Sequence, residues 1–359
     1  MYTLSLELVN ECNLNCSYCY LGKKKNRRIS RDNICRAIEL AMDEAVKQYD
    51  KTLVVYFIGG EPLLAFDMIK FAVNFCEENS RSLIIKYSLT TNGILINQEI
   101  TDYFIDKNFE IKLSIDGDKK VHDKNRKSYN GDGSFDVVIS KLKYIKQYEM
   151  KTGKLCHISQ VITTNNYLEI VNGIEKFREL GFTFIESGID KYACWGEHDI
   201  QALEKELEQA FEYYKVLKMQ GEKIYWHFWE SYIQNYFSER DICFFACHAG
   251  LVSCFVNADG IIYPCKEVKG MEIGDVFSGL DIEKIRAINR IAVTENAKCL
   301  QCEYLKKCKT QGCLIDNFGF NGNFYDVTEI SCQVTKFIYA LMEHKLSSEQ
   351  KLAFCSFYH

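Results

Sequence analysis

The stretch Glu11-Cys-Asn-Leu-Asn-Cys-Ser-Tyr-Cys-Tyr20 (ECNLNCSYCY) places three cysteines, Cys12, Cys16 and Cys19, within eight residues. It directly follows an apolar segment, residues 3–9, that is typical of a buried strand. Structural zinc and iron–sulfur sites usually take four thiolate or imidazole ligands, and this loop offers three. The spacing therefore predicts a metal or cluster site whose fourth ligand comes from elsewhere.

Strand-like and helix-like segments alternate from the first residue to about residue 189. The predicted strands cover residues 3–9, 53–58, 83–89, 111–115, 158–163 and 182–186. The predicted helices cover residues 31–48, 66–78, 135–150 and 167–180, with Ser30 as the expected N-cap of the first. This α/β rhythm predicts a parallel sheet that forms a partial (β/α)6 TIM-type barrel. Such a barrel has its site at the C-terminal ends of its strands, where the three-cysteine loop lies.

The second half of the chain has a different character. A polar helical segment over residues 200–219 leads to a region in which both periodicities break up. Residues 252–264 alternate and turn at Asp259-Gly260, which predicts a hairpin. We expect a barrel over residues 1–195, a helical bridge over 196–240, a small cysteine-rich, metal-binding domain over 241–335, and a C-terminal helix and tail over 336–359.

The bulk composition excludes several classes of protein. The chain has 359 residues, 47% of them hydrophobic, and a net charge of −5, so nucleic acid is not an expected partner. No apolar run is long enough for a membrane span and no signal peptide is evident, so we expect a cytoplasmic protein. Seventeen cysteines in such a chain favour metal ligation over a disulfide framework. A basic run, Gly22-Lys-Lys-Lys-Asn-Arg-Arg28, is either a solvated loop or a contact for an acidic peptide or phosphates.

Further motifs follow the predicted strands in order. They are GGEPLL (59–64), SLTTNG (88–93), LSIDG (113–117) and VHDKNR (121–126). With these motifs the chain resembles the radical S-adenosylmethionine (SAM) enzymes, whose Cys-x3-Cys-x2-Cys loop binds a 4Fe–4S cluster. The resemblance implies that Cys12, Cys16 and Cys19 leave one iron open for the amino and carboxylate groups of SAM. A zinc or redox loop is the alternative for the three cysteines alone.

The same resemblance implies which residues contact SAM. Glycines let the backbone approach a ligand closely, and Glu61 offers a carboxylate to an ammonium group. Ser114 and Arg126 are expected to contact the carboxylate and ribose of SAM. The implied set is Tyr18, Gly59, Gly60, Glu61, Asn92, Ser114, Asp116 and Arg126. The cofactors then supply the difficult chemistry, and the barrel orients and shields them.

The C-terminal cysteines resemble a SPASM domain, which usually holds two auxiliary 4Fe–4S clusters. The resemblance assigns Cys299, Cys302, Cys308 and Cys332 to the distal cluster, and Cys247, Cys265 and Cys313 to the proximal cluster. The fourth position of the proximal cluster could be filled by Cys254 or Cys243, or stay open for a substrate thiolate. Cys254 is equally well explained as a buried core thiol. A structural zinc site is the alternative for the knuckle cysteines, and Cys35, Cys76 and Cys156 are expected in the core.

SPASM enzymes act mostly on peptides or protein side chains. Sulfatase-maturating enzymes resemble this chain in length and layout, but the aspartate that follows their hairpin cysteine is Lys266 here. Lysine is a poor base unless its pKa is strongly lowered, although Glu267 or Asp275 could supply a carboxylate. We therefore expect a maturase that forms a crosslink, above all a thioether, in a ribosomally made peptide.

Alternative functions stay open at this point. One is a formylglycine-forming enzyme, and another is a peptide epimerase in which Cys194 or Cys355 returns a hydrogen. A non-enzymatic alternative is an iron–sulfur electron carrier, against which GGEP argues. The expected partners are a precursor peptide, an electron donor such as flavodoxin or ferredoxin, and a separate leader-binding protein.

Overall fold

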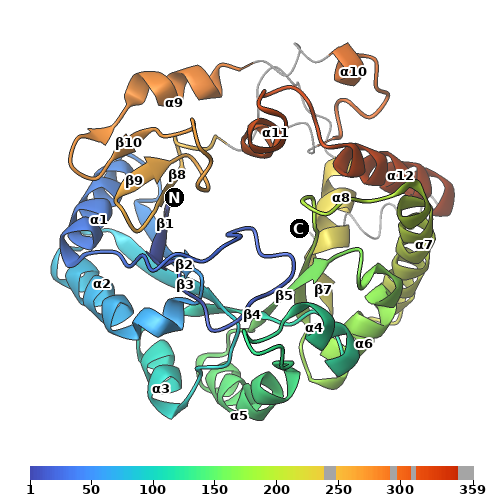
Figure 1. Cartoon of the computed structure of the whole chain (residues 1–359), viewed down its shortest axis with the longest axis horizontal. Helices are drawn as coiled ribbons and strands as arrows, with labels where there is room; N and C mark the ends of the chain where they lie inside the picture. Colours follow the sequence, from blue (N-terminus) through green and yellow to red (C-terminus); the bar gives the residue numbers. More distant parts are fainter. Residues whose placement is uncertain (238–247, 292–296, 309–312, 347–359) are drawn as a thin grey trace. The chain divides into compact units, whose positions relative to one another are not determined.

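The computed structural model describes residues 1–237, 248–291, 297–308 and 313–346 (Figure 1). The chain divides into two compact units. The first contains residues 1–159 and 248–288. The second contains residues 160–247 and 289–359, of which the ranges named above are described. Cys243, Cys247 and Cys355, which carry predictions, lie outside the described residues.

The first unit is built on a sheet of parallel strands. Its strands are β1 (Tyr2–Val9), β2 (Thr52–Gly59), β3 (Ile84–Thr91), β4 (Glu110–Ser114) and β5 (His157–Ile162), which pair in chain order. The side chains of Leu4, Leu6 and Leu8 in β1 are all buried, as expected for a central strand of a parallel sheet. The sequence-based strands agree with these to within two residues at each end. The last predicted strand, residues 182–186, corresponds to β6 (Phe184–Ile189) and ends three residues later than predicted.

Helices connect the strands of this unit. They are α1 (Arg31–Val46), η1 (Pro62–Ala65), α2 (Phe66–Glu78), α3 (Gln98–Asp106), α4 (Lys119–Asn125) and α5 (Phe135–Thr152). Ser30 caps α1 as predicted, because its side chain accepts a hydrogen bond from the Asn33 amide at 3.1 Å. Figure 1 shows α1, α2, α3 and α5 along the outer side of the strands. The short helices α3 and α4, capped by Asn97 and Asp118, were not among the predicted helices.

The predicted hairpin is confirmed, and it extends the same sheet. β8 (Ser253–Val256) and β9 (Ile261–Tyr263) are antiparallel, and β8 also pairs in parallel with β1. Gly260 has φ +85° in the turn, a conformation that L side chains rarely adopt. Two short strands, β10 (Gly274–Asp275) and β11 (Gly279–Leu280), and helix α9 (Ile282–Asn289) follow. The hairpin therefore lies directly beside the strand that leads into the three-cysteine loop.

The second unit is mainly helical. Strands β6 (Phe184–Ile189) and β7 (Tyr225–Trp226) pair in parallel. The helices are η2 (Tyr167–Glu169), α6 (Ile170–Glu179), α7 (Glu197–Met219), α8 (His227–Phe237), α10 (Ala297–Leu300), α11 (Leu314–Asn321) and α12 (Glu329–Lys345). Buried aromatic side chains, among them Trp226, Trp229 and Tyr339, form much of its core. Over the part of the chain that the structure describes, no helix is both long and apolar enough to cross a membrane.

Candidate functional site

The three-cysteine loop is fixed by the last residue of α4 and by the segment that follows it. The amide of Ser17 donates to the Asn125 carbonyl at 3.0 Å, and the Ser17 hydroxyl donates to the Asn125 side chain at 2.8 Å. The amide of Asn15 donates to the Lys127 carbonyl at 2.7 Å. Asn125 lies within the VHDKNR motif but carried no prediction. Asn125 anchors the loop through its contact with Ser17, a residue 108 positions away in the sequence.

The two glycines of GGEP lie against the start of this loop. The Gly60 amide donates to the Val9 carbonyl at 2.8 Å, and the Glu61 amide donates to the Glu11 carbonyl at 2.9 Å. A Cβ atom at Gly60 would lie 1.9 Å from the Glu11 oxygen, and one at Gly59 would lie 2.2 Å from the Val9 oxygen. Only glycine fits at both positions, because any side chain would collide with backbone atoms.

Glu61 is buried at the ends of β2 and β3. Its carboxylate accepts hydrogen bonds from the Leu63 amide at 3.1 Å, the Thr91 hydroxyl at 2.8 Å and the Asn92 amide at 2.8 Å. Burial raises the pKa of Glu61 to about 7, against the lowering effect of these donors. A carboxylate can accept about four hydrogen bonds, and Glu61 accepts three here. One acceptor position is therefore left for the ammonium group of SAM, the contact expected from the sequence.

Tyr18, Asp116 and Arg126 form a buried group at the end of β4. The Tyr18 hydroxyl donates to the two Asp116 oxygens at 2.8 and 3.1 Å. Arg126 Nε lies 3.2 Å from Asp116 Oδ2, but its N–H is not aimed at that oxygen and makes no hydrogen bond. The guanidinium lies 5.4 Å from the centre of the Tyr18 ring. A buried cation with an unsatisfied donor is well suited to bind an anionic or hydroxyl group of a ligand.

His122 is connected to this group by hydrogen bonds through Ser134. It lies on α4, is completely buried, and forms a 2.9 Å hydrogen bond between Nε2 and the Ser134 hydroxyl. The Ser134 hydroxyl in turn donates to the Arg126 carbonyl at 2.7 Å. Burial lowers the pKa of His122 to about 3, so the ring is neutral. His122 therefore positions the backbone of Arg126 without adding a charge.

Two polar residues that the sequence analysis did not single out line the loop. The side chain of Asn92, a predicted SAM contact, donates to Asn13 at 2.7 Å. Lys24 Nζ lies 2.6 Å from Cys19 Sγ. Both Asn13 and Lys24 line a cavity of about 340 Å³ beside Cys12. Ser114, the last residue of β4, is buried.

The basic run after the cysteines is largely paired within the chain. Arg27 contacts the carboxylates of Glu7, Asp259 and Glu267 at 2.8, 2.9 and 2.8 Å. Glu7 is fully buried and also accepts from the Ala258 amide at 3.0 Å. Arg27 thereby joins β1, the loop and the β8–β9 hairpin. For Arg27 this interaction differs from both interpretations of the run, because its guanidinium is paired with carboxylates of the same chain.

The carboxylates considered as replacements for the missing aspartate are already engaged. Burial disfavours the ionised form of Glu267, but the hydrogen bond from Arg27 outweighs it and the pKa is lowered. Hydrogen bonds from Ser278 lower the pKa of Asp275. Lowered pKa values make both groups weak bases. Lys266 is half-buried, and Cys194, the candidate hydrogen donor, is exposed between β6 and α7.

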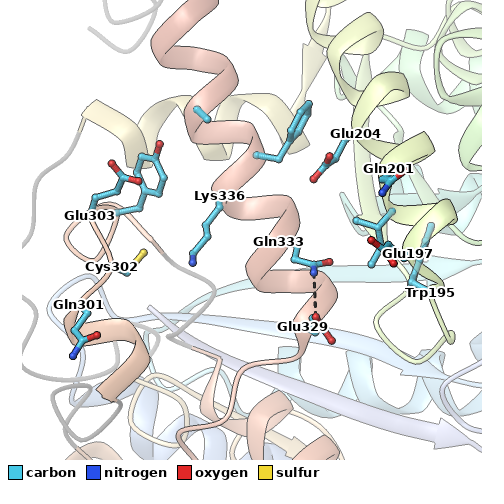
Figure 2. Close-up of a pocket in the computed structure, with 14 residues that line it drawn as sticks. Trp195, Glu197, Gln201, Glu204, Gln301, Cys302, Glu303, Glu329, Gln333 and Lys336 are labelled. Atoms are coloured by element: carbon cyan, nitrogen blue, oxygen red, sulfur yellow. Dashed lines mark hydrogen bonds between the residues drawn. The ribbon is translucent and has the colours of Figure 1, made fainter.

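The residues predicted for the distal cluster lie in the second unit. Burial is the main cause that raises the pKa of Cys299 to about 11, and the thiols of Cys308, Cys332 and Cys302 contribute in the same direction. Cys302 lines a pocket of about 930 Å³, and Figure 2 shows Lys336 extending from α12 toward it. Figure 2 also shows the hydrogen bond from Gln333 to Glu329, at 3.1 Å, on the same helix.

The other predicted cysteines are spread over the chain. Cys265 is exposed after β9, and Cys313 directly precedes α11, where burial raises its pKa to about 12. Cys254 is buried in β8 opposite Leu4, the environment expected of a core thiol. Cys76 and Cys156 are buried as predicted, whereas Cys35 on α1 is partly exposed.

The geometry fits the cofactors that the sequence implied. Among the described residues, no group of three or more histidine, cysteine or acidic side chains already has the arrangement of a metal site. The first loop nevertheless offers three half-buried free thiols next to glycine-only backbone and a buried guanidinium with an unsatisfied donor. Three thiolates suit a 4Fe–4S cluster with one open iron.

Residues 6–167 match the model of the radical SAM superfamily. This part of the chain is similar to that superfamily. An uncharacterized protein of Methanocaldococcus jannaschii is 33% identical over 171 residues, which are 47% of this chain and 56% of the relative. The chain thus spans about half the length of that relative. The cysteine-type anaerobic sulfatase-maturating enzyme of Clostridium perfringens (strain 13) is 26% identical over 326 residues, 83% of this chain and 85% of the enzyme.

Two solved structures show the same fold. Native anSMEcpe with bound AdoMet and Cp18Cys peptide has a TM-score of 0.78 at 19% identity, covering 99% of this chain and 100% of that one. Streptococcus suis SuiB bound to the precursor peptide SuiA has a TM-score of 0.63 at 20% identity, covering 92% and 75%. The predicted fold, a partial TIM-type barrel followed by a small cysteine-rich SPASM domain, is confirmed.

Proposed function

We propose that this chain is a radical SAM oxidoreductase that removes hydrogen from a side chain of a peptide or protein. The observation that carries the proposal is the close fit of Gly59 and Gly60 against residues 9–11, directly before Cys12. This arrangement brings an amino-acid-binding backbone segment to the edge of a three-thiolate loop. An iron–sulfur electron carrier needs only the thiolates to hold its cluster, and it does not need the Gly59–Gly60 segment beside them.

The residues at the barrel end have distinct roles in this proposal. Cys12, Cys16 and Cys19 hold the first 4Fe–4S cluster, and Glu61 with the Gly59–Gly60 backbone holds the amino group of SAM. Ser114 and the unsatisfied donor of Arg126 hold its carboxylate and ribose. Asn92, through its bond to Asn13, and the Tyr18–Asp116 pair keep the residues around SAM in position. When bound, SAM next to a reducible cluster supplies hydrogen-atom abstraction from an unactivated C–H bond.

Two auxiliary clusters complete the proposed cofactor set. Cys299, Cys302, Cys308 and Cys332 would hold the distal one, in line with the mutual influence of their thiols. For the proximal one the assignment to Cys247, Cys265 and Cys313 rests on the sequence resemblance alone, and Cys247 lies outside the described residues. The proposal requires a peptide substrate and a low-potential one-electron donor of the flavodoxin or ferredoxin type. Bound peptides in anSMEcpe and SuiB support the substrate class.

We favour formation of a thioether crosslink as the specific reaction. Sulfatase maturation would need a base where this chain has Lys266, and both nearby carboxylates are poor substitutes. Glu267 is committed to Arg27 at 2.8 Å, and Asp275 accepts hydrogen bonds from its own turn. Formation of a thioether would join a carbon to a cysteine sulfur with loss of two hydrogens. The hydrogen atom on carbon would pass to the 5′-deoxyadenosyl group of cleaved SAM, the thiol would lose its proton, and the remaining electron would pass to an iron–sulfur cluster.

Formylglycine formation is the second candidate. It is favoured by the sulfatase-maturating relative, which aligns over 83% of this chain. The two reactions differ in their products, because formylglycine replaces the thiol with an aldehyde while a thioether keeps the sulfur.

The test uses anaerobically reconstituted protein with SAM, dithionite and two sets of cysteine-containing peptides, precursor-like and sulfatase-like. Thioether formation predicts loss of two hydrogens by mass spectrometry and loss of one thiol toward iodoacetamide, without reaction with a hydrazide probe. A hydrazide-reactive product from the sulfatase-like peptide would establish the second candidate instead. Absence of SAM cleavage with every peptide would contradict the enzyme assignment itself.

A further inference from the structure

Lys24 is set apart from the rest of the basic run by its contact with a predicted cluster ligand. Its ammonium lies 2.6 Å from the Cys19 sulfur and it is half-buried, whereas Lys23 is exposed. Arg27 and Arg28 on the same run contact carboxylates. In the described part of the chain, Lys24 thus directs its charge at a thiol rather than at an acidic side chain.

The backbone around Lys24 holds it in this place. The Gly22 amide donates to the Cys19 carbonyl at 2.9 Å, which turns the chain back on the cysteine loop. The Lys25 amide donates to the Asn10 side chain at 2.8 Å, and that side chain also donates to the buried Glu7 at 3.0 Å. Residues on both sides of Lys24 are therefore tied to the end of β1.

Lys24 lies beside the loop that carries all three cysteines. Its ammonium contacts the sulfur of Cys19, and Cys12 and Cys16 belong to the same eight-residue stretch. Lys24 also lines the cavity next to Cys12, together with Leu64 and Tyr129. A cation in contact with one of these sulfurs would favour any negative charge added to a cluster that the three cysteines hold.

We infer that Lys24 sets the reduction potential of the first cluster, by donating a hydrogen bond to the Cys19 sulfur and by stabilising the reduced state. The inference rests on the proposed function. The step that it assists is the transfer of one electron from an external ferredoxin- or flavodoxin-type donor. The donor would be oxidised by one electron, a cluster held by Cys12, Cys16 and Cys19 would gain that electron and become more negative by one charge, and no bond would form or break. Hydrogen bonds to sulfur and local charge are known determinants of such potentials.

The test compares Lys24→Met, Lys24→Gln and Lys24→Arg with wild type and with Lys23→Met, the matched control from the same run. Each holoenzyme is titrated with redox mediators and followed by EPR. The first cluster is recognised as the signal that changes when SAM is added, and iron content and circular dichroism are measured in parallel. We expect Lys24→Met and Lys24→Gln to disfavour reduction of that signal about tenfold, which is about 59 mV for a one-electron couple. Lys24→Arg should lie close to wild type, and Lys23→Met and the auxiliary signals should not move.

An unchanged midpoint in Lys24→Met and Lys24→Gln, with iron content intact, would overturn the inference and leave the proposed function standing. Loss of the signal in both neutral variants, with Lys24→Arg intact, would also overturn it, since Lys24 would then be needed for cluster assembly. If no signal in wild type responds to SAM, the proposed function fails, and the inference fails with it.

Discussion

The hydroxyl of Tyr18 donates to the fully buried carboxylate of Asp116 at 2.8 Å, across 98 residues of sequence. This bond links the three-cysteine loop to the end of β4. Arg126 lies beside both residues. The loop is therefore positioned by a buried polar group as well as by its backbone.

Tyr18→Phe should weaken this link. A hydrogen bond to a charged group contributes about 1.5–3 kcal/mol, so the free energy of unfolding should fall by about that amount. SAM affinity should fall as well, because Asp116 is freed to move toward Arg126. Urea denaturation and calorimetric titration measure the two effects. Tyr49→Phe, at a fully exposed tyrosine, is the control, and equal stability of the two variants would contradict the assigned role.

Gly60→Ala should slow SAM cleavage about a hundredfold while leaving the barrel folded. The new Cβ would meet the Glu11 oxygen at 1.9 Å, so the glycine segment must move away from the cysteine loop. A displacement of about 1 Å at a reacting site costs about a hundredfold in rate. Gly188→Ala is the control, since a Cβ there has no neighbour within 4 Å. Formation of 5′-deoxyadenosine is the measurement. Normal turnover by Gly60→Ala would show that SAM cleavage does not depend on the close fit of Gly60 against Glu11.

Arg27→Met should be severely destabilising. It leaves the buried carboxylate of Glu7 without its cation, and breaking such a pair costs about 3–5 kcal/mol. Arg28→Met removes only the exposed contact with Asp67 and should cost less than about 1 kcal/mol. Thermal and urea unfolding distinguish the two. Equal effects would mean that Arg27 does not join the hairpin to β1 as described.

The raised pKa of Glu61 should make the stability of the protein without bound cofactors depend on pH. Burial raises its pKa from 4.5 to about 7, so between these values the folded state holds a proton that the unfolded state has released. The contribution of Glu61 to the free energy of unfolding should therefore be greatest below pH 4.5. It should fall by about 3 kcal/mol in all as the pH rises to about 7. Glu61→Gln should flatten the curve over that window, and Glu39→Gln, at an exposed site, should not. Parallel curves for wild type and Glu61→Gln would contradict this expectation.

Cys302→Ala should remove one auxiliary cluster and no other. Loss of one ligand of four destabilises a 4Fe–4S cluster, so the iron content should fall by about four atoms per chain. Cys76→Ala, at a buried thiol on α2, should retain all iron and lose only stability. Iron and sulfide analysis after anaerobic reconstitution is the measurement. Unchanged iron in Cys302→Ala would argue against the distal assignment.

Local chemistry in the sequence predicted most of the fold. Alternating and continuous apolar runs located β1 to β5, Ser30 marked the start of α1, and Asp259-Gly260 marked the hairpin turn. Each of these signals acts over a few residues, through backbone propensity, capping or the freedom of glycine. The three-cysteine spacing and GGEP likewise indicated the site from adjacent residues alone.

Contacts between distant residues were decided by the tertiary structure. The sequence did not reveal that β8 pairs with β1, that Arg27 meets Glu7 and Glu267, or that Lys24 contacts Cys19. The Glu7 contact with Ala258 spans 251 residues. Such partners are selected by the packing of the sheet and by the need to pair buried charges, and neither leaves a local pattern. The sequence by itself therefore determined which chemistry the first loop can hold, while the tertiary structure determined which charges surround it.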